Sequence, residues 1–312
     1  MRVIQMVDKR KLNKWQREVL KLENRADKKA ERKLWSIYNN VLKETQAKIK
    51  DYLEEFDKLP EYKKAQLYGL QRLEKEVVDI LNAAYPESKK VILDYKTMAS
   101  VDGYYQQIYQ AQQGMVTGLK FDGIDKDFIA QAVNSPVNGK TLSNRLYKSR
   151  KKLARHATSI ITSGVSQGLG YGQIAQRMRA ATEASLYQSL RIARTEGGRL
   201  RSQSRQKAQE ELIKRGFEVK KMWMSALDTR VRSSHAHLDG QIVGVDEEFT
   251  SPTGATAKAP RLFGVASEDI NCRCTVVTVI DDAKPELRRD GEGKVTKYRN
   301  YSQWAKANGV KY

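Results

Sequence analysis

Apolar residues recur every three or four positions through much of the first half of the chain, which is the spacing of one face of an α-helix. One such run covers residues 12–41, with mixed charges between the apolar positions. A second covers residues 67–80, and Pro86 is expected to end that helix because proline lacks the N–H that a helix needs. A third, over residues 91–109, carries aromatic residues at similar spacing. The pattern predicts a long-helix region over residues 1–120, expected to form a helical bundle and a partner-contact surface.

A second, basic helical region is predicted over residues 121–216. Asp125 is placed to cap a short helix, and the sequence "NSPVNGKT" then breaks the pattern with Asn, Pro and Gly together. Helical spacing resumes near Ile160, pauses at "GLGYG" and runs again over residues 174–215. Gly216 follows at the position where a glycine commonly ends a helix.

The pattern changes after Gly216 from helical spacing to that of strands. The segment "FEVKKMWMSA" alternates apolar and polar residues, and "CTVVTVI" is a β-branched run that looks buried. Glycine and proline punctuate the sequence between them, as in a compact, loop-rich domain. The chain is therefore expected to be α+β, with an extended, mainly α-helical N-terminal region followed by a small α+β domain over residues 217–285. A C-terminal tail with a short helix is expected over residues 286–312.

The charge of the chain is strongly positive, with 57 lysines and arginines against 37 acidic residues and a formal net charge of +20. A field of that sign favours polyanions such as nucleic acid, an acidic protein surface or anionic lipid, although lysine-rich solvated helix faces explain it equally well. Residues 140–155 contain seven basic residues and no acidic one. Glu196 and Arg199, three positions apart, are expected to form an ordinary surface pair. The candidate nucleic-acid contacts are Lys140, Arg145, Lys148, Arg150, Lys151, Lys152 and Arg155, with Arg194, Arg199 and Arg201 on a later helix.

Membrane and secreted classes are not favoured by this sequence. No apolar run approaches the roughly 20 residues that cross a bilayer. Residues 1–16 lack the apolar segment and the small-residue cleavage site of a secretory signal. The two cysteines, Cys272 and Cys274, are too splayed along one strand for a disulfide, so we expect reduced thiols in a cytoplasm.

The chemically distinctive residues gather late in the chain, in "SSHAHLDG" and "EDINCRC". Cys272 and Cys274 are expected on one face if the strand begins at "NCRC". Two thiolates, the imidazole of His235 and a fourth ligand, either the carboxylate of Asp228 or a second imidazole, would make a tetrahedral zinc set. A helical turn at this point would direct His237 away from the site, whereas an extended segment would bring the two histidines together.

Other interpretations of this cluster stay open. The C-x-C and H-x-H spacings differ from those of most zinc sites, so the cysteines can instead be small buried residues beside a backbone-bonded histidine. A cysteine with His235 would form a nucleophile–base pair. Asp228 or Asp239 with His235 would support metal-assisted phosphodiester hydrolysis. We assign no catalytic residue, because no glycine-rich phosphate loop or other local signature accompanies these side chains.

Five motifs follow one another in a specific order over roughly residues 140–285. They are "GLGYGQIAQRM" at 168–178, "ARTEGGR" at 193–199, "MWMSALDTRVRSSHAHLDG" at 222–240, a proline-bearing loop at 251–261 and "INCRC" at 270–274. In this order and spacing the chain resembles the phage head morphogenesis or minor capsid proteins of the Mu F-like family. Asp228, His235, Asp239, Cys272 and Cys274 occupy the family's recurrent polar positions, and Trp223, Gly240 and Asn271 complete the framework of the small domain.

The resemblance implies a minor structural protein of a tailed-phage head, located in the capsid interior of the virion and in the host cytoplasm during assembly. It implies the portal protein, capsid or scaffold proteins and packaged double-stranded DNA as partners, with no membrane and no enzymatic activity. The alternatives are a metal-dependent nuclease or toxin-like effector centred on His235, and a basic DNA-binding protein that acts on its own.

Overall fold

The computed structural model describes residues 12–114, 121, 123–137, 139–225, 230–280, 287–289, 295–297, 306–307 and 309. Among these residues, no helix combines the length and the apolar character that a bilayer span requires. The tail predicted over residues 286–312 lies mostly outside this set, as does Asp228.

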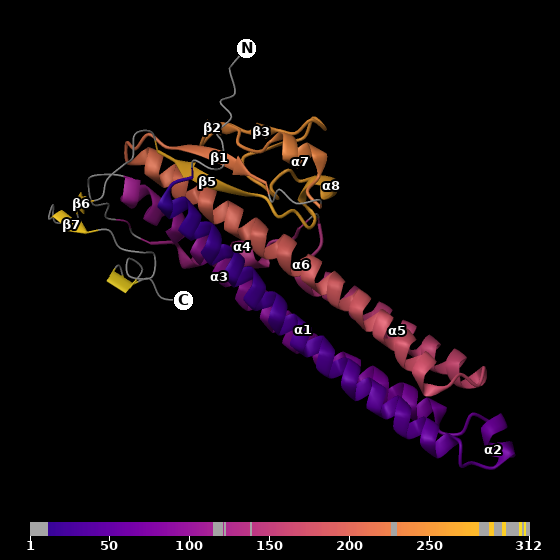
Figure 1. Cartoon of the computed structure of the whole chain (residues 1–312). Helices are drawn as coiled ribbons and strands as arrows, with labels where there is room; N and C mark the ends of the chain where they lie inside the picture. The colour runs from indigo at the N-terminus through magenta and orange to yellow at the C-terminus, as the bar shows by residue number, and fades with distance from the viewer. Residues whose placement is uncertain are drawn as a thin grey trace. The chain divides into compact units, whose positions relative to one another are not determined.

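Long helices dominate the first two thirds of the chain and short strands follow them (Figure 1), so the predicted α+β class is confirmed. The helices are α1 (Lys14–Phe56), α2 (Glu61–Ala65), α3 (Leu70–Gly114), α4 (Lys126–Asn134), α5 (Leu142–Ser166), α6 (Tyr171–Lys214), α7 (Ser233–His237) and α8 (Ala266–Asp269). The strands are β1 (Lys220–Met224), β2 (Ile242–Gly244), β3 (Phe249–Thr250), β4 (Thr256–Ala257), β5 (Thr275–Val279), β6 (Leu287–Arg289) and β7 (Val295–Lys297). The antiparallel sheets are β2-β1-β5, β3-β4 and β6-β7.

Local signals place some helix ends correctly and one wrongly. Asp125 caps α4 by accepting a hydrogen bond from a backbone N–H, and Gly216 adopts φ +87° just after α6, both as predicted. Pro86, however, lies inside α3, so the prediction that it ends this helix is wrong. A proline inside a helix costs about 3 kcal/mol. The buried residues Leu81 and Ile92 on either side of it keep the helix packed through the proline.

The chain forms two compact units, each assembled from separate stretches of sequence. The helical unit comprises residues 28–93 and 139–192, and the sheet-bearing unit comprises the rest of the chain. Three of the boundaries therefore fall inside α1, α3 and α6 and the fourth lies between α4 and α5, whereas the sequence predicts four consecutive regions. Long helices explain the difference, because they bring residues that are distant in sequence into one core.

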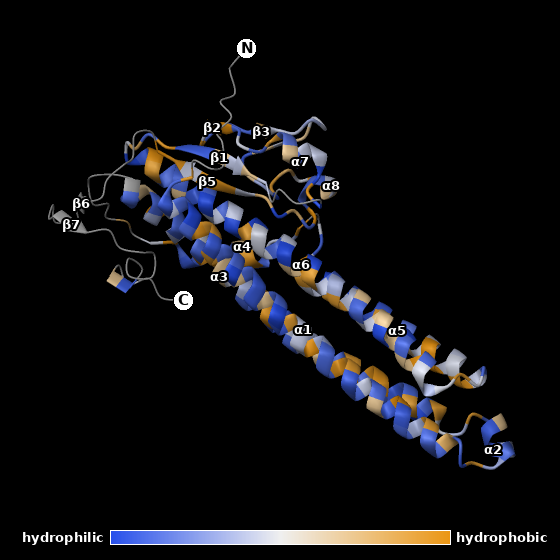
Figure 2. Ribbon diagram, in the orientation of Figure 1, coloured by the Kyte–Doolittle hydropathy of each residue, from blue (hydrophilic) through white to orange (hydrophobic). Residues whose placement is uncertain are grey.

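The helical unit has an apolar core, and Figure 2 shows the apolar positions as orange bands along its helices. At one contact, between α5 and α6, a Cβ added to Gly164 would lie 2.7 Å from the side chain of Ile174, so the helices approach closely there. Burial of a large aliphatic side chain contributes roughly 1.5–3 kcal/mol. The core includes Val41 and Ile49 of α1, Leu73 and Val77 of α3, Ile161 of α5 and Met178 of α6.

The sheet-bearing unit places the sheet β2-β1-β5 along the later part of α6 (Figure 1). Arg205 of α6 donates a 2.9 Å hydrogen bond to the carbonyl of Val276 in β5. Gln206 donates another, also of 2.9 Å, to the carbonyl of Val245. Polar side chains of α6 are therefore buried here because they satisfy backbone groups of the sheet.

Strand β1 is buried on both faces from Lys221 to Met224, although it begins with two lysines. Lys221 explains the difference, because its buried ammonium donates to the Val245 carbonyl at 2.6 Å and to Gln206 Oε1 at 3.2 Å. Burial, with a smaller contribution from the charge of Lys258, lowers the pKa of Lys221 to about 8. A lysine in the sequence is thus no reliable sign of a solvent-facing position in this strand.

Candidate metal centre

The two histidines of "SSHAHLDG" lie in different surroundings. Both lie in the short helix α7, where His235 is buried and His237 is exposed. Residues two apart in a helix are rotated by about 200°, so they lie on opposite sides. The helical alternative of the sequence analysis is therefore the observed one, and the H-x-H pair does not form.

The two cysteines lie in the turn between α8 and β5. Strand β5 begins at Thr275, so the prediction that the strand includes Cys272 and Cys274 is wrong. Asn271 adopts φ +59°, a left-handed conformation that turns the chain just before them. The backbone N–H of Cys274 donates to the sulfur of Cys272 at 3.4 Å, and this local bond keeps both side chains on the same side of the turn. Both thiols are free and buried.

The two sulfurs converge on a single nitrogen of His235. Nδ1 lies 3.5 Å from the sulfur of Cys272 and 3.4 Å from that of Cys274. The three donor atoms all lie within 4.8 Å of one another, which is close enough to hold one metal ion. Three of the four predicted zinc ligands therefore come together, and the fourth, Asp228, lies outside the described residues.

Glu268 of α8 holds the other nitrogen of the ring. Its Oε2 lies 2.7 Å from His235 Nε2, and the carboxylate also accepts hydrogen bonds from the hydroxyls of Ser234 and Thr253. The sequence analysis did not single out this residue, although it stands four positions before Cys272 in the same quoted segment. A carboxylate that fixes a ring in this way is a common partner of histidines that bind metals.

Aromatic side chains enclose the cluster. The indole of Trp223 lies edge-on to the His235 ring at a centroid distance of 5.5 Å, and the ring of Phe263 stacks on it at 5.9 Å. Phe249 packs in turn against Trp223. His235 and both cysteines are each only 1% exposed, so the cluster is closed to solvent.

The protonation of the cluster is uneven. The hydrogen bond from Cys274 holds the pKa of Cys272 well below that of an ordinary thiol, against the effect of burial, and the same bond raises the pKa of Cys274. Burial opposes the charging of His235, but its hydrogen bonds and proximity to Cys272 and Glu268 outweigh burial and raise its pKa. Cys272 is thus the more acidic thiol of the pair, and His235 is more basic than an ordinary imidazole.

The other framework residues shape the backbone around the cluster. Asp239 accepts hydrogen bonds from the backbone N–H of Ser225 at 2.7 Å and from its hydroxyl at 2.9 Å. Gly240 adopts φ +78° and donates its N–H to the carbonyl of Trp223 at 2.9 Å. Asp239 is not among the described side chains that could share a metal with His235, so the geometry gives no support to hydrolysis by that pair.

The motif "ARTEGGR" connects α6 to the turn that carries the cysteines. Arg194 donates to Asn271 Oδ1 at 2.6 Å, and the hydroxyl of Thr195 accepts the Asn271 N–H at 2.9 Å. A Cβ on Gly197 would lie 2.1 Å from the Tyr95 ring, and one on Gly198 would lie 2.3 Å from the Arg261 guanidinium. Arg261 in turn donates to the carbonyl of Cys272 at 2.9 Å. The paired glycines therefore leave room for side chains that hold the cysteine turn against the helix.

Several arginines of this helix make contacts inside the protein. Arg201 is buried and pairs with Asp27 at 2.9 Å, so the prediction that it contacts nucleic acid is wrong. Arg199 is partly buried and donates to the carbonyls of Ala132 and Ser135. Glu196 is buried, so it is not the surface residue that the sequence suggests. The polar side chains at these positions therefore make their contacts within the protein.

Helix α5 carries the basic run of residues 140–155. Arg150 stacks over the rings of Tyr85 and Tyr147 at 5.1 and 4.7 Å, and Arg145 is also only partly exposed. The nucleic-acid contact of this run stays a prediction. The exposed members are Lys140, Lys148, Lys151, Lys152 and Arg155.

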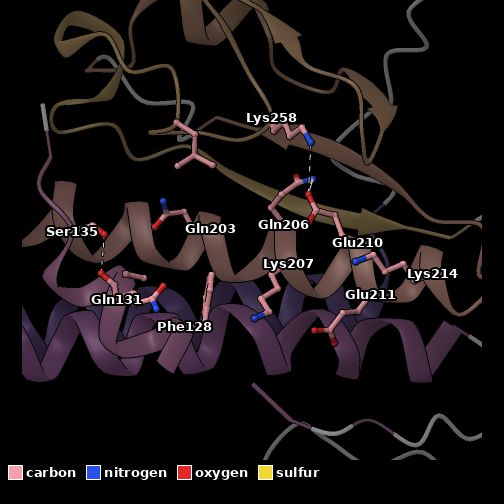
Figure 3. A pocket seen from close by; sticks show the side chains of 12 residues that line it. Phe128, Gln131, Ser135, Gln203, Gln206, Lys207, Glu210, Glu211, Lys214 and Lys258 are labelled. Carbon is pink, nitrogen blue, oxygen red and sulfur yellow. Dashed lines mark hydrogen bonds and ion pairs between the residues drawn. The ribbon is translucent and has the colours of Figure 1, made fainter. Parts of the chain in front are cut away.

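A cavity of about 510 Å³ lies elsewhere in the sheet-bearing unit, and Figure 3 shows the side chains that line it. Phe128 of α4 and Lys207 of α6 face each other across it, with the ammonium 4.2 Å from the ring centroid. Glu210 pairs with Lys258 at 3.7 Å. None of the candidate ligands lines this cavity, so we assign it no chemistry.

The chain matches known proteins over most of its length. The family described as phage Mu protein F like protein matches residues 155–277. The chain is 34% identical to the minor head protein GP7 of Bacillus phage SPP1, over 89% of this chain and 92% of that protein. It is 40% identical to a protein of Enterococcus faecalis named NAD(+)-arginine ADP-ribosyltransferase EFV, over 94% of this chain but only 60% of that protein.

A third relative, an uncharacterized protein of Haemophilus influenzae, is 29% identical over 50% of this chain and 33% of its own length. No solved structure gives a significant match. The match to GP7 extends over nearly the whole of both proteins, and the family match covers the second half of α5, all of α6 and the metal-ligand candidates. The chain therefore belongs to the phage Mu protein F-like family, which includes a minor head protein.

Proposed function

We propose that this protein is a minor structural component of a tailed-phage head, which joins the head during assembly and contacts the portal from the capsid interior. The observation that carries the proposal is the 34% identity with minor head protein GP7, which extends over 89% of this chain and 92% of that protein. Capsid or scaffold proteins would be its other protein partners. The enzyme name of the E. faecalis relative is not carried over, because the match covers only 60% of that protein.

The surface of the helical unit supports a role in protein contact. It carries most of the exposed large hydrophobic side chains of the described residues. Examples are Tyr62 and Tyr68 near α2 and Tyr187 of α6, which are 63%, 59% and 59% exposed. Tyrosine is enriched in protein interfaces because its ring contributes a large contact area and its hydroxyl a hydrogen bond. The proposed portal contact is therefore on the helical unit.

Sedimentation with purified portal oligomers and proheads tests this proposal. The parent protein is expected in the portal and prohead fractions, and a Tyr62→Ser/Tyr68→Ser variant is expected in smaller amount. Val265→Thr is the matched control, because Val265 is 43% exposed but lies in the sheet-bearing unit. Absence of the parent protein from proheads, portal fractions and purified virions would contradict the head role itself, whereas an unchanged double variant would contradict only the placement of the contact.

Contact with packaged DNA is the finer part of the proposal, and α5 is the surface that favours it. Lys148, Lys151, Lys152 and Arg155 follow the spacing of one helix face, and all four are exposed. No acidic residue lies among them in the run 140–155, so their fields add. This face would bind the phosphate backbone without reading its sequence.

Neutralising these four residues to glutamine is expected to weaken DNA binding and to flatten its salt dependence. Each phosphate contact that is lost lowers the slope of log K against log salt by about 0.9 for duplex DNA. The matched control neutralises four exposed residues of α1, Lys28, Lys29, Arg32 and Lys33, which are interleaved with acidic residues. Fluorescence anisotropy with duplex DNA at several salt concentrations measures both slopes. Equal slopes for the two variants would show that net charge alone, and no α5 surface, drives binding.

A further inference from the structure

The buried cluster between α7 and the cysteine turn has the composition and the geometry of a metal site. We propose that Cys272, Cys274 and Nδ1 of His235 bind one zinc ion, which fastens the turn before β5 to α7. Cysteine and histidine are the preferred ligands of structural zinc, whereas hard cations such as calcium and magnesium prefer oxygen.

The distances from the ring nitrogen to the two sulfurs fit a zinc site. Zinc bonds of about 2.3 Å to sulfur and about 2.0–2.1 Å to nitrogen give an S···N separation of roughly 3.6 Å across a tetrahedral edge. The two observed separations are 3.5 Å for Cys272 and 3.4 Å for Cys274. A single ion near the centre of the three donor atoms would therefore reach all of them.

Hydrogen bonds alone account less well for this arrangement. A ring nitrogen carries at most one proton, so Nδ1 of His235 can direct a linear hydrogen bond to only one of the two sulfurs. The other sulfur is served by the hydrogen bond between the two cysteines, inside a site closed to solvent. A zinc ion satisfies both sulfurs and the ring nitrogen at once, which explains why all three converge on one point.

Glu268 orients the imidazole of His235 as a metal ligand. Because its carboxylate lies 2.7 Å from Nε2, it favours the tautomer with the proton on Nε2 and leaves the lone pair of Nδ1 facing the sulfurs. The hydroxyls of Ser234 and Thr253 hold the carboxylate in place. Glu268 is thus a positioning residue for the proposed ligand.

The burial of the site indicates a structural ion. A catalytic zinc keeps an open position that substrate can reach, whereas Trp223, Phe263 and the rest of the apolar cluster cover this one. The strands around it are two to five residues long, so a metal bond between α7 and the cysteine turn would contribute strongly to order in this domain. Asp228 is the predicted fourth ligand, and its contribution is tested separately below.

Metal content and cobalt spectroscopy of the full chain test the proposal. The protein is stripped under reducing conditions, reconstituted with zinc and measured by elemental analysis, and one zinc per chain is expected. His235→Ala should abolish uptake, whereas His237→Ala, which removes an exposed histidine of the same helix, should retain it. Cobalt(II) bound to the parent protein should show the absorption bands of tetrahedral coordination and thiolate-to-cobalt charge transfer. This measurement needs no variant, so it decides the question even where His235→Ala fails to fold.

Glu268→Gln and Asp228→Asn separate the remaining roles by competition with a chelator. Loss of an outer partner of a ligating histidine typically lowers metal affinity 10–100-fold, and we expect that loss for Glu268→Gln with an unchanged unfolding temperature of the stripped protein. An unchanged affinity in Asp228→Asn would overturn its assignment as fourth ligand. A reduced parent protein that takes up no zinc and gives no tetrahedral cobalt spectrum would overturn the site.

Discussion

Replacing Glu196 with alanine is expected to destabilise the folded protein by about 3–5 kcal/mol, because it leaves a buried ammonium without its counter-ion. The Nζ of Lys96 lies 2.9 Å from Glu196 Oε2, and both side chains are only 1% exposed. The same ammonium donates to the carbonyl of Val133 at 2.6 Å, at the C-terminal end of α4. The pair thus connects α3, α6 and α4 within the sheet-bearing unit.

Denaturant unfolding measures this loss, and two comparisons assign it to the ion pair. Glu183→Ala removes an exposed carboxylate from the same helix and is expected to change stability by less than about 0.5 kcal/mol. A double variant, Lys96→Met/Glu196→Leu, should recover most of the stability, because an apolar pair needs no counter-charge. A Glu196→Ala variant that unfolds at the same denaturant concentration as Glu183→Ala would show that the ion pair contributes nothing.

The helices and the class of fold follow from local patterns, which is why the sequence predicts them. The three- and four-residue spacing of apolar positions appears in the structure as α1, α3, α5 and α6. Asp125 and Gly216 act as caps because capping depends only on neighbouring backbone groups. The prediction that Pro86 ends the helix fails because packing along both halves of α3 outweighs the local free-energy cost of the proline. Packing of that kind is not visible in a local pattern.

Buried charges account for most of the other differences. Glu196 and Arg201 resemble surface residues in the sequence, yet each is buried against a partner about one hundred or more positions away. Lys221 is buried in β1 for the same reason, since its partners are supplied by α6 and by the loop after β2. Pairings over such separations cannot be deduced from one chain without its fold.

The candidate metal centre was predictable in part because its ligands are rare residue types. The chain has only two cysteines and three histidines, and both cysteines lie together with His235. Glu268 was missed because carboxylates are common in the chain and nothing local distinguishes this one. Its role depends on α8 facing α7, which is a property of the tertiary structure.

A second large effect is expected at Gly103, where α3 approaches the backbone of α6 closely. A Cβ added to Gly103 of α3 would lie 2.6 Å from the carbonyl oxygen of Arg201 and 3.0 Å from its Cα. These are backbone atoms of α6, so no rotation of a side chain can relieve the contact. The close approach also seats Arg201 where it pairs with Asp27. Alanine at residue 103 must therefore separate two packed helices.

Gly103→Ala is expected to destabilise the protein by about 1–3 kcal/mol, the usual cost of overpacking. The sign of the change in stability separates the two effects. Replacing glycine with alanine inside a helix otherwise stabilises the helix by up to about 1 kcal/mol through helix propensity. Gly172→Ala is the matched control, since Gly172 lies near the start of α6 with nothing within 4 Å of an added Cβ. The unfolding temperature and the denaturant midpoint should therefore fall in Gly103→Ala and rise in Gly172→Ala. Stabilisation by both would mean that α3 and α6 tolerate separation at residue 103, and that helix propensity alone governs this position.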